Sequence, residues 1–233
     1  MVPGIYRMNF RGLTLREAWR FSGEPFKFVI ALALKAAGFG GSRLWLPPHE
    51  CVAPCTAEDL SPEAAAALLP AVAEARDLGY TEGRYSRLVR LVDPSNGPGF
   101  AHLALHRDRQ RFIFLAFATT HAGGISRSAS TISGGLLGDD GIKHSFLNHN
   151  NYFDDGQDSV HHRVRGRTVA AVDTAMQQHT AQSRCSFRGF ATLADLKATI
   201  EALDEAAFDA RIARGLFRYV GSELPPGGIP PPL

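Results

Sequence analysis

The sequence predicts an α+β protein in which one antiparallel sheet is covered by helices mainly on one face. The densest run of strand-forming residues lies between Phe100 and Ser133, and turn residues interrupt it at 107–109 and 123–124. Helical patterns come before and after this run and do not alternate with its strands. Consecutive hairpins of this kind favour an antiparallel meander over a parallel sheet.

The remaining strands and helices surround this central run. Shorter strands are predicted over 84–92, 142–147 and 160–164, where apolar residues partly alternate with polar ones. Two capping signals predict helices: Ser61 precedes a helix that Pro70 should kink or split, and Thr192-x-x-Asp195 begins one that runs on or bends through Leu216 and Tyr219. Another helix is predicted from Thr168 to Gln182 by its apolar stripe.

The 233 residues are enough for one large domain or for one domain with an appended segment. We predict an N-terminal helical arm and linker over 1–48, an α+β domain over 49–221, and an extended Pro-rich tail over 222–233. The first twelve residues have no period and are expected to be extended. Prolines and weak periodicity over 42–55 favour a linker.

The N-terminal arm contains two predicted helices. The capping box Thr14-x-x-Glu17 begins the first, and Pro25 begins a second that is apolar nearly all round. This segment is expected either to pack on the domain as a helical hairpin or to bury itself in a partner protein or on a membrane surface. The candidate interaction residues are its large aromatic side chains: Trp19, Phe21, Phe26 and Phe28.

Composition excludes few classes of protein. Hydrophobic residues make up 45% of the chain and charged residues 21%, which is ordinary for a globular protein. A net charge of +2 does not favour a nucleic-acid partner. The three cysteines, Cys51, Cys55 and Cys185, do not form a disulfide framework, and we expect a reducing, cytoplasmic location. No segment has the pattern of a secretory signal or a spanning helix.

The chain contains no G-x-G-x-x-G, P-loop or G-x-S-x-G motif, so these nucleotide-binding and hydrolase classes lose support. The chemistry-like region spans residues 121–162, is rich in histidine and aspartate, and lies largely within the irregular stretch 134–167. These residue types bind zinc, manganese or iron(II), and a divalent metal is the only cofactor that the pattern suggests. The candidate metal ligands are His144, His149, Asp154, Asp155, Asp158, His161 and His162. The competing interpretations are a polar surface loop and a pocket for a nonmetal ligand.

Two functions from different classes follow. The first is a non-catalytic interaction or assembly protein that docks on a partner, or on itself, through the N-terminal arm, the Pro-rich tail or both. The alternative is a metal-dependent hydrolase or nuclease that uses the loop 144–162. Whether the protein is an enzyme is left open by the sequence, because no catalytic motif is complete.

Overall fold

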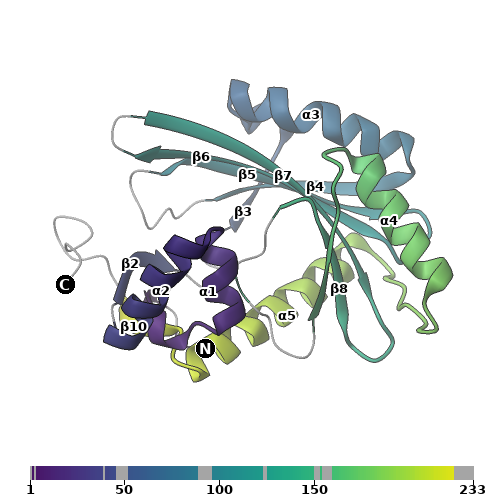
Figure 1. Ribbon diagram of the computed structural model, residues 1–233. Helices are drawn as coiled ribbons and strands as arrows, with labels where there is room; N and C mark the ends of the chain where they lie inside the picture. Colours follow the sequence, from purple (N-terminus) through teal and green to yellow (C-terminus); the bar gives the residue numbers. More distant parts are fainter. Residues whose placement is uncertain are drawn as a thin grey trace.

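The fold is α+β, as the sequence predicts. The computed structural model describes residues 2, 4–38, 40–45, 52–88, 96–122, 125–149, 153 and 159–222. Its strands form one sheet of seven strands and one of three. Figure 1 shows the two sheets at different ends of the molecule.

The seven-stranded sheet is a meander in which every strand pairs with its neighbour in the chain. All pairs are antiparallel except the last, β8–β9, which is parallel. The strands are β3 (Val52–Cys55), β4 (Tyr80–Leu88), β5 (Asn96–His106), β6 (Phe112–Ala122), β7 (Ile125–Leu137), β8 (Lys143–Leu147) and β9 (Ser159–Arg163).

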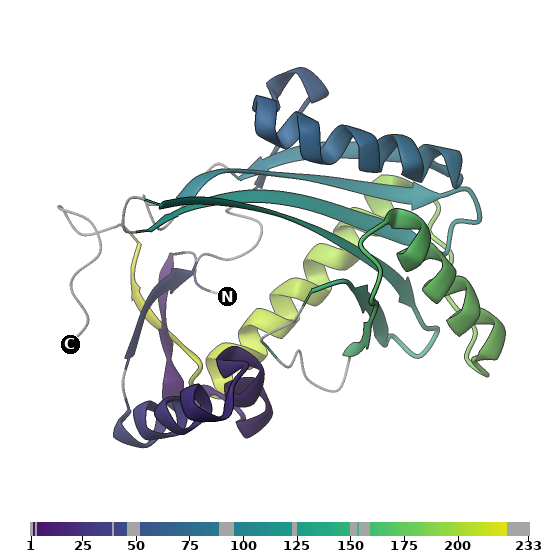
Figure 2. The ribbon, with the colours of Figure 1, turned by 45° about the horizontal axis from the view of Figure 1, so that its top comes forward.

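Helices cover both faces of this sheet, two of them on one face. The helices α3 (Pro62–Asp77) and α4 (Val169–Gln182) pack on one face, over a core that includes Phe146 and Ile113. The long helix α5 (Leu193–Ala213) crosses the opposite face, where Leu196 meets Leu105 and Phe112. Figure 2 shows α5 extending from beneath the large sheet toward the small one.

The helix α3 follows directly from its sequence. The Ser61 hydroxyl accepts a hydrogen bond from the Ala64 N–H at 3.2 Å, which caps the helix start. Leu68 and Val72 point to the sheet and are almost fully buried. The predicted kink does not divide the element, since α3 continues through Pro70 as one helix whose apolar stripe is held on the sheet.

The small sheet joins the two ends of the described chain. Its strands are β1 (Ile5–Asn9), β2 (Gly40–Trp45) and β10 (Phe217–Gly221), and both neighbours of the central strand β1 are antiparallel to it. Between β1 and β2 lie α1 (Leu15–Ser22) and α2 (Pro25–Ala37). Single 3₁₀ turns occur at Phe10–Gly12 and Ala57–Asp59.

The strands at the two ends of the chain refine the sequence-based expectations. The segment before Gly12 is extended in part, as expected, and its extended part is the paired strand β1. The stretch 42–55, expected to be a linker, contains the end of β2 and all of β3 in its described part. The last helix does not run on to Tyr219, because Gly215 adopts a left-handed φ of 77° and the chain continues as β10. The spacing of Leu216 and Tyr219 was therefore misleading.

The predicted division at residue 48 stays a prediction, but β1 and β10, from its two sides, are hydrogen-bonded to each other. The helix α1 is also tied to the end of α5. The fully buried Glu17 carboxylate accepts a hydrogen bond from the Arg214 guanidinium and closes the predicted capping box with the Thr14 N–H at 2.8 Å. Residues 223–233 of the predicted tail lie outside the described residues.

Candidate functional site

Three histidines from three different elements meet between the sheet and α4. They are His144 on β8, His162 on β9 and His179 on α4. The parallel register places Phe146 opposite His162, so His144 and His162 lie on the same face of neighbouring strands. One ligand nitrogen from each of the three imidazoles lies within 4.8 Å of the others. We call these residues the histidine cluster.

The imidazole rings of the histidine cluster are packed closely. His144 Nδ1 lies 3.3 Å from His162 Nε2, and the His179 ring centroid lies 4.8 Å from that of His144 and 4.5 Å from that of His162. Two buried phenylalanines form the wall of the cluster. Phe146 stacks on His162 at 4.6 Å, and Phe187 meets His144 edge-on at 5.6 Å.

This environment favours neutral imidazole. Burial, together with the nearby His179 and His144, lowers the pKa of His162 to about 4. Burial and His179 also lower the pKa of His144. Neutral imidazole is the form that binds a metal ion. Within the described part of the chain, the buried His179 Nε2 has no hydrogen-bond partner.

The other predicted metal ligands do not join this cluster where they are described. His161 precedes His162 in an extended strand, so its side chain points to the opposite face of the sheet. His149 is exposed just beyond β8, with its Nδ1 3.4 Å from Asn148 Oδ1. Three carboxylates lie outside the described residues: Asp154, Asp155 and Asp158.

His179 was not predicted from the sequence, although the helical spacing of α4 indicates it. Val169, Val172 and Met176 form the buried stripe of α4. Continuing this helical spacing by three residues reaches His179, which is therefore directed to the sheet. The position of a histidine at the end of an apolar helical stripe therefore indicates a side chain that faces the core.

A second feature is an apolar face on the N-terminal helices. Five large apolar side chains of α1 and α2 are exposed, and we call them the α1–α2 apolar face: Leu15 (63%), Trp19 (47%), Phe26 (75%), Val29 (64%) and Ile30 (45%). Two of the predicted interaction residues, Trp19 and Phe26, belong to it. Phe28 is half-buried and supports Trp19 through an edge-on ring contact at 5.2 Å. The Phe21 side chain lies outside the described part of the structure.

The sequence analysis also missed a buried polar network at one end of the sheet. Asp173 of α4 accepts hydrogen bonds from the Tyr80 hydroxyl at 2.7 Å and from the Arg111 guanidinium. Arg111 also binds Asp108, whose carboxylate lies 2.9 Å from His106 Nδ1. Burial opposes ionisation of Asp108, but hydrogen bonds led by that from Arg111 lower its pKa to about 2. Because the charged groups of this network are paired with one another, it joins α4 to β4 and to the β5–β6 turn.

Comparison with known proteins assigns no family. The chain matches no protein-family model, no curated protein and no solved structure. None of the described helices is both long enough and apolar enough to cross a membrane.

Proposed function

We propose that this protein is a non-catalytic assembly protein whose α1–α2 apolar face binds a second copy of the same chain. The observation that supports this proposal is the exposure of five large apolar side chains on one helical hairpin. A contiguous apolar patch on a protein surface is typical of an interaction site, whereas single exposed apolar residues are ordinary.

The exposed residues of α2 follow helical spacing. Phe26, Val29 and Ile30 are continued by the exposed Ala33 and Ala37, so the five positions lie on one side of the helix. None of them is charged. Depletion of charge is typical of the buried centre of a protein interface.

The shape of this stripe favours self-association. Its first turn carries the large Phe26 and its second half carries the small Ala33 and Ala37. Two copies of α2 packed antiparallel about a two-fold axis would place each phenylalanine against the alanines of the other copy. The exposed ion pair between Lys27 and Glu24, at 3.1 Å, would then lie at the polar rim.

A membrane surface is the competing occupant of the same face. A helix that lies on an anionic membrane needs basic residues beside its apolar stripe. Arg16 is exposed on α1, but the Lys27 ammonium is paired with Glu24, which reduces the basic charge on α2. We therefore favour the second copy and treat membrane binding as an outcome of the test.

The cysteines bear on the cellular compartment of the proposed assembly protein. Cys55 and Cys185 are free thiols, which fits a reducing compartment such as the cytoplasm. The metal-dependent hydrolase or nuclease stays the alternative prediction, since the aspartates that it would use lie outside the described residues.

The test is the molar mass in solution over a range of concentrations. We expect the natural chain to form a dimer and Val29→Glu to remain monomeric, because the substitution places a charge at the centre of the stripe. Leu69→Glu is the matched control, since Leu69 is 42% exposed on α3, outside the stripe. This control is expected to dimerise like the natural chain, and both variants should keep its circular dichroism spectrum.

Two results would contradict self-association. One is a natural chain that stays monomeric at every concentration. The other is dimerisation of Val29→Glu to the same extent as the natural chain. A monomeric natural chain that co-floats with phosphatidylserine vesicles, while Val29→Glu does not, would assign the face to a membrane surface instead.

A further inference from the structure

We infer that the histidine cluster is a binding site for one divalent transition-metal ion of the zinc class, held by His144, His162 and His179 with a fourth position open to water. This site lies between the sheet and α4, and Figure 1 shows α4 and β8 apart from α1 and α2, so the site does not depend on the proposed self-association.

The donor atoms select the class of metal. Three imidazole nitrogens, with no carboxylate among the described members of the group, suit zinc, cobalt, nickel or copper. Calcium and magnesium prefer oxygen ligands and are not expected to bind here. Zinc sites with three protein ligands keep a fourth position for water or another small ligand.

The spacing of the nitrogens suits a tetrahedral ion. Zinc–nitrogen bonds of about 2.0–2.1 Å place two ligand nitrogens roughly 3.3–3.4 Å apart. The distance between His144 Nδ1 and His162 Nε2 is 3.3 Å. The strand pairing of β8 with β9 therefore holds these two nitrogens at the separation that a tetrahedral ion requires, and binding of the ion replaces the direct contact between them.

His179 supplies the third ligand from the opposite layer. Its nitrogen lies within 4.8 Å of the other two, so binding requires this half-buried side chain to move toward them. The buried Nε2 of His179 lacks a hydrogen-bond partner in the described structure. Buried polar atoms normally have partners, and a bound ion accounts for the exception.

The surrounding rings restrict access of water to the site. Phe146 and Phe187 are both buried and pack against the imidazoles from the sheet side and from the loop after α4. An apolar wall fixes the ring orientations and limits solvent access around a bound ion. The competing interpretation is a cluster of aromatic rings held by packing and by a hydrogen bond between His144 and His162, whose ring planes lie within 12° of each other.

The experiment uses the full chain, produced without a polyhistidine tag, stripped with EDTA and titrated with Zn²⁺. We expect one zinc per chain by calorimetry and by elemental analysis, and a raised melting temperature. His179→Gln should weaken binding by at least about 10- to 100-fold, the loss that even an outer-shell change causes at metal sites. His149→Gln is the matched control and should bind zinc like the natural chain.

A measurement on the natural chain tests the site even if the His179→Gln variant does not fold. Of the nine histidines, we expect the ring-nitrogen NMR signals of three to shift on addition of one equivalent of Zn²⁺. Co²⁺ should give visible absorption bands that His179→Gln lacks. Absence of stoichiometric zinc in the natural chain, equal affinity in His179→Gln, or loss of binding in His149→Gln would overturn the site and leave a packed ring cluster.

Discussion

The helices α2 and α3 are both rich in apolar residues, yet they present them in opposite directions. Leu68 of α3 is 1% exposed and packs on the seven-stranded sheet, whereas Phe26 of α2 is 75% exposed. Leu68 is buried because α3 packs on the apolar core of the seven-stranded sheet. On α2 the buried position is the small Ala31, and the largest side chains face away from the protein. The comparison separates an apolar stripe that stabilises the fold from one that is available to a partner.

The two regions are anchored in a similar way. In each, a buried carboxylate binds an arginine of another element: Asp173 of α4 binds Arg111, and Glu17 of α1 binds Arg214 near the end of α5. Helices α4 and α1 are therefore each fixed to the rest of the protein by a buried ion pair. The difference between the regions lies in their outer faces.

The largest expected effect comes from breaking the anchor of the large sheet. Asp173→Ala leaves Arg111 and Tyr80 without their carboxylate, and removal of one partner from a buried ion pair costs about 3–5 kcal/mol. Urea unfolding measures this change. The control is Glu201→Ala, which removes an exposed ion pair with Lys197 and should cost under about 1 kcal/mol. Equal losses of unfolding free energy in the two variants would contradict a stabilising role for the Asp173 network.

The next effect tests the contrast between α3 and α2 directly. Leu68→Ala should lower the free energy of unfolding by about 2–5 kcal/mol, because it opens a cavity against the sheet. Phe26→Ala should change it by no more than about 0.5 kcal/mol in dilute, monomeric protein, because the ring lies in solvent. A loss above 2 kcal/mol for Phe26→Ala would mean that α2 packs against the domain with its apolar face.

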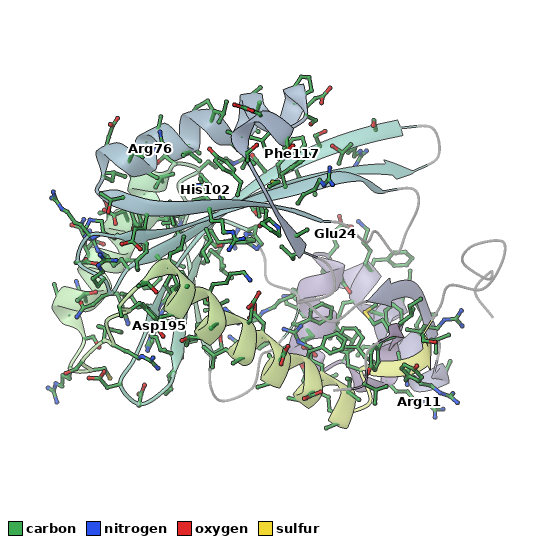
Figure 3. All side chains as sticks on the ribbon, turned by 180° about the vertical axis from the view of Figure 1, so that it is seen from behind. Arg11, Glu24, Arg76, His102, Phe117 and Asp195 are labelled. Atoms are coloured by element: carbon green, nitrogen blue, oxygen red, sulfur yellow. The ribbon has the colours of Figure 1, made fainter. Side chains whose placement is uncertain are left out.

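The smallest expected effect is a dependence of stability on pH that originates beneath α3. His102 lies on β5, facing α3 and Arg76, as Figure 3 shows. Gly83 allows this close packing, since a β-carbon there would come within 2.5 Å of the imidazole. Burial, and to a lesser extent the charge of Arg76, lowers the pKa of His102 to about 4.

The sign of this dependence follows from the lowered pKa. The unfolded chain, with a histidine pKa of about 6.5, binds the proton more readily than the folded protein. The contribution of neutral His102 to the free energy of unfolding is fully present above about pH 6.5. It is lost as the pH falls toward 4, and the loss is at most about 3 kcal/mol. Urea unfolding at several pH values, compared with His102→Gln, isolates this contribution. Parallel pH curves for the two proteins would contradict it.

The meander could be predicted from the sequence because its strand pairs and turns come from neighbouring segments of the chain. Each strand pairs with the next one in the chain, and Arg109, with a left-handed φ of 67°, marks a turn that the charged sequence already indicated. The small sheet could not be predicted this way. The partners of β1 come from distant parts of the chain, and five-residue strands such as β10 have too short a pattern to identify them.

The candidate site was predictable only in part for the same reason. His144 and His162 were recognised because they lie in an irregular, polar stretch that stands out in the sequence. His179 lies on a regular helix, and only the packing of α4 on the sheet brings it to them. The exposed side of α2 could not be predicted for another reason. A helix that is apolar on all sides has no polar face to indicate which side is exposed.

The pairing of β1 with β10 also sets an order for folding during synthesis. These strands are roughly 210 residues apart in the chain. At a translation rate of about 5–20 residues per second, β1 would wait about 10–40 s for its partner to emerge from the ribosome. The meander needs only contacts between successive segments and can form in the meantime. The small sheet must be completed last, so the nascent N-terminal helices and the β1–β2 pair spend that interval without β10 and the end of α5, with their apolar side chains open to chaperones.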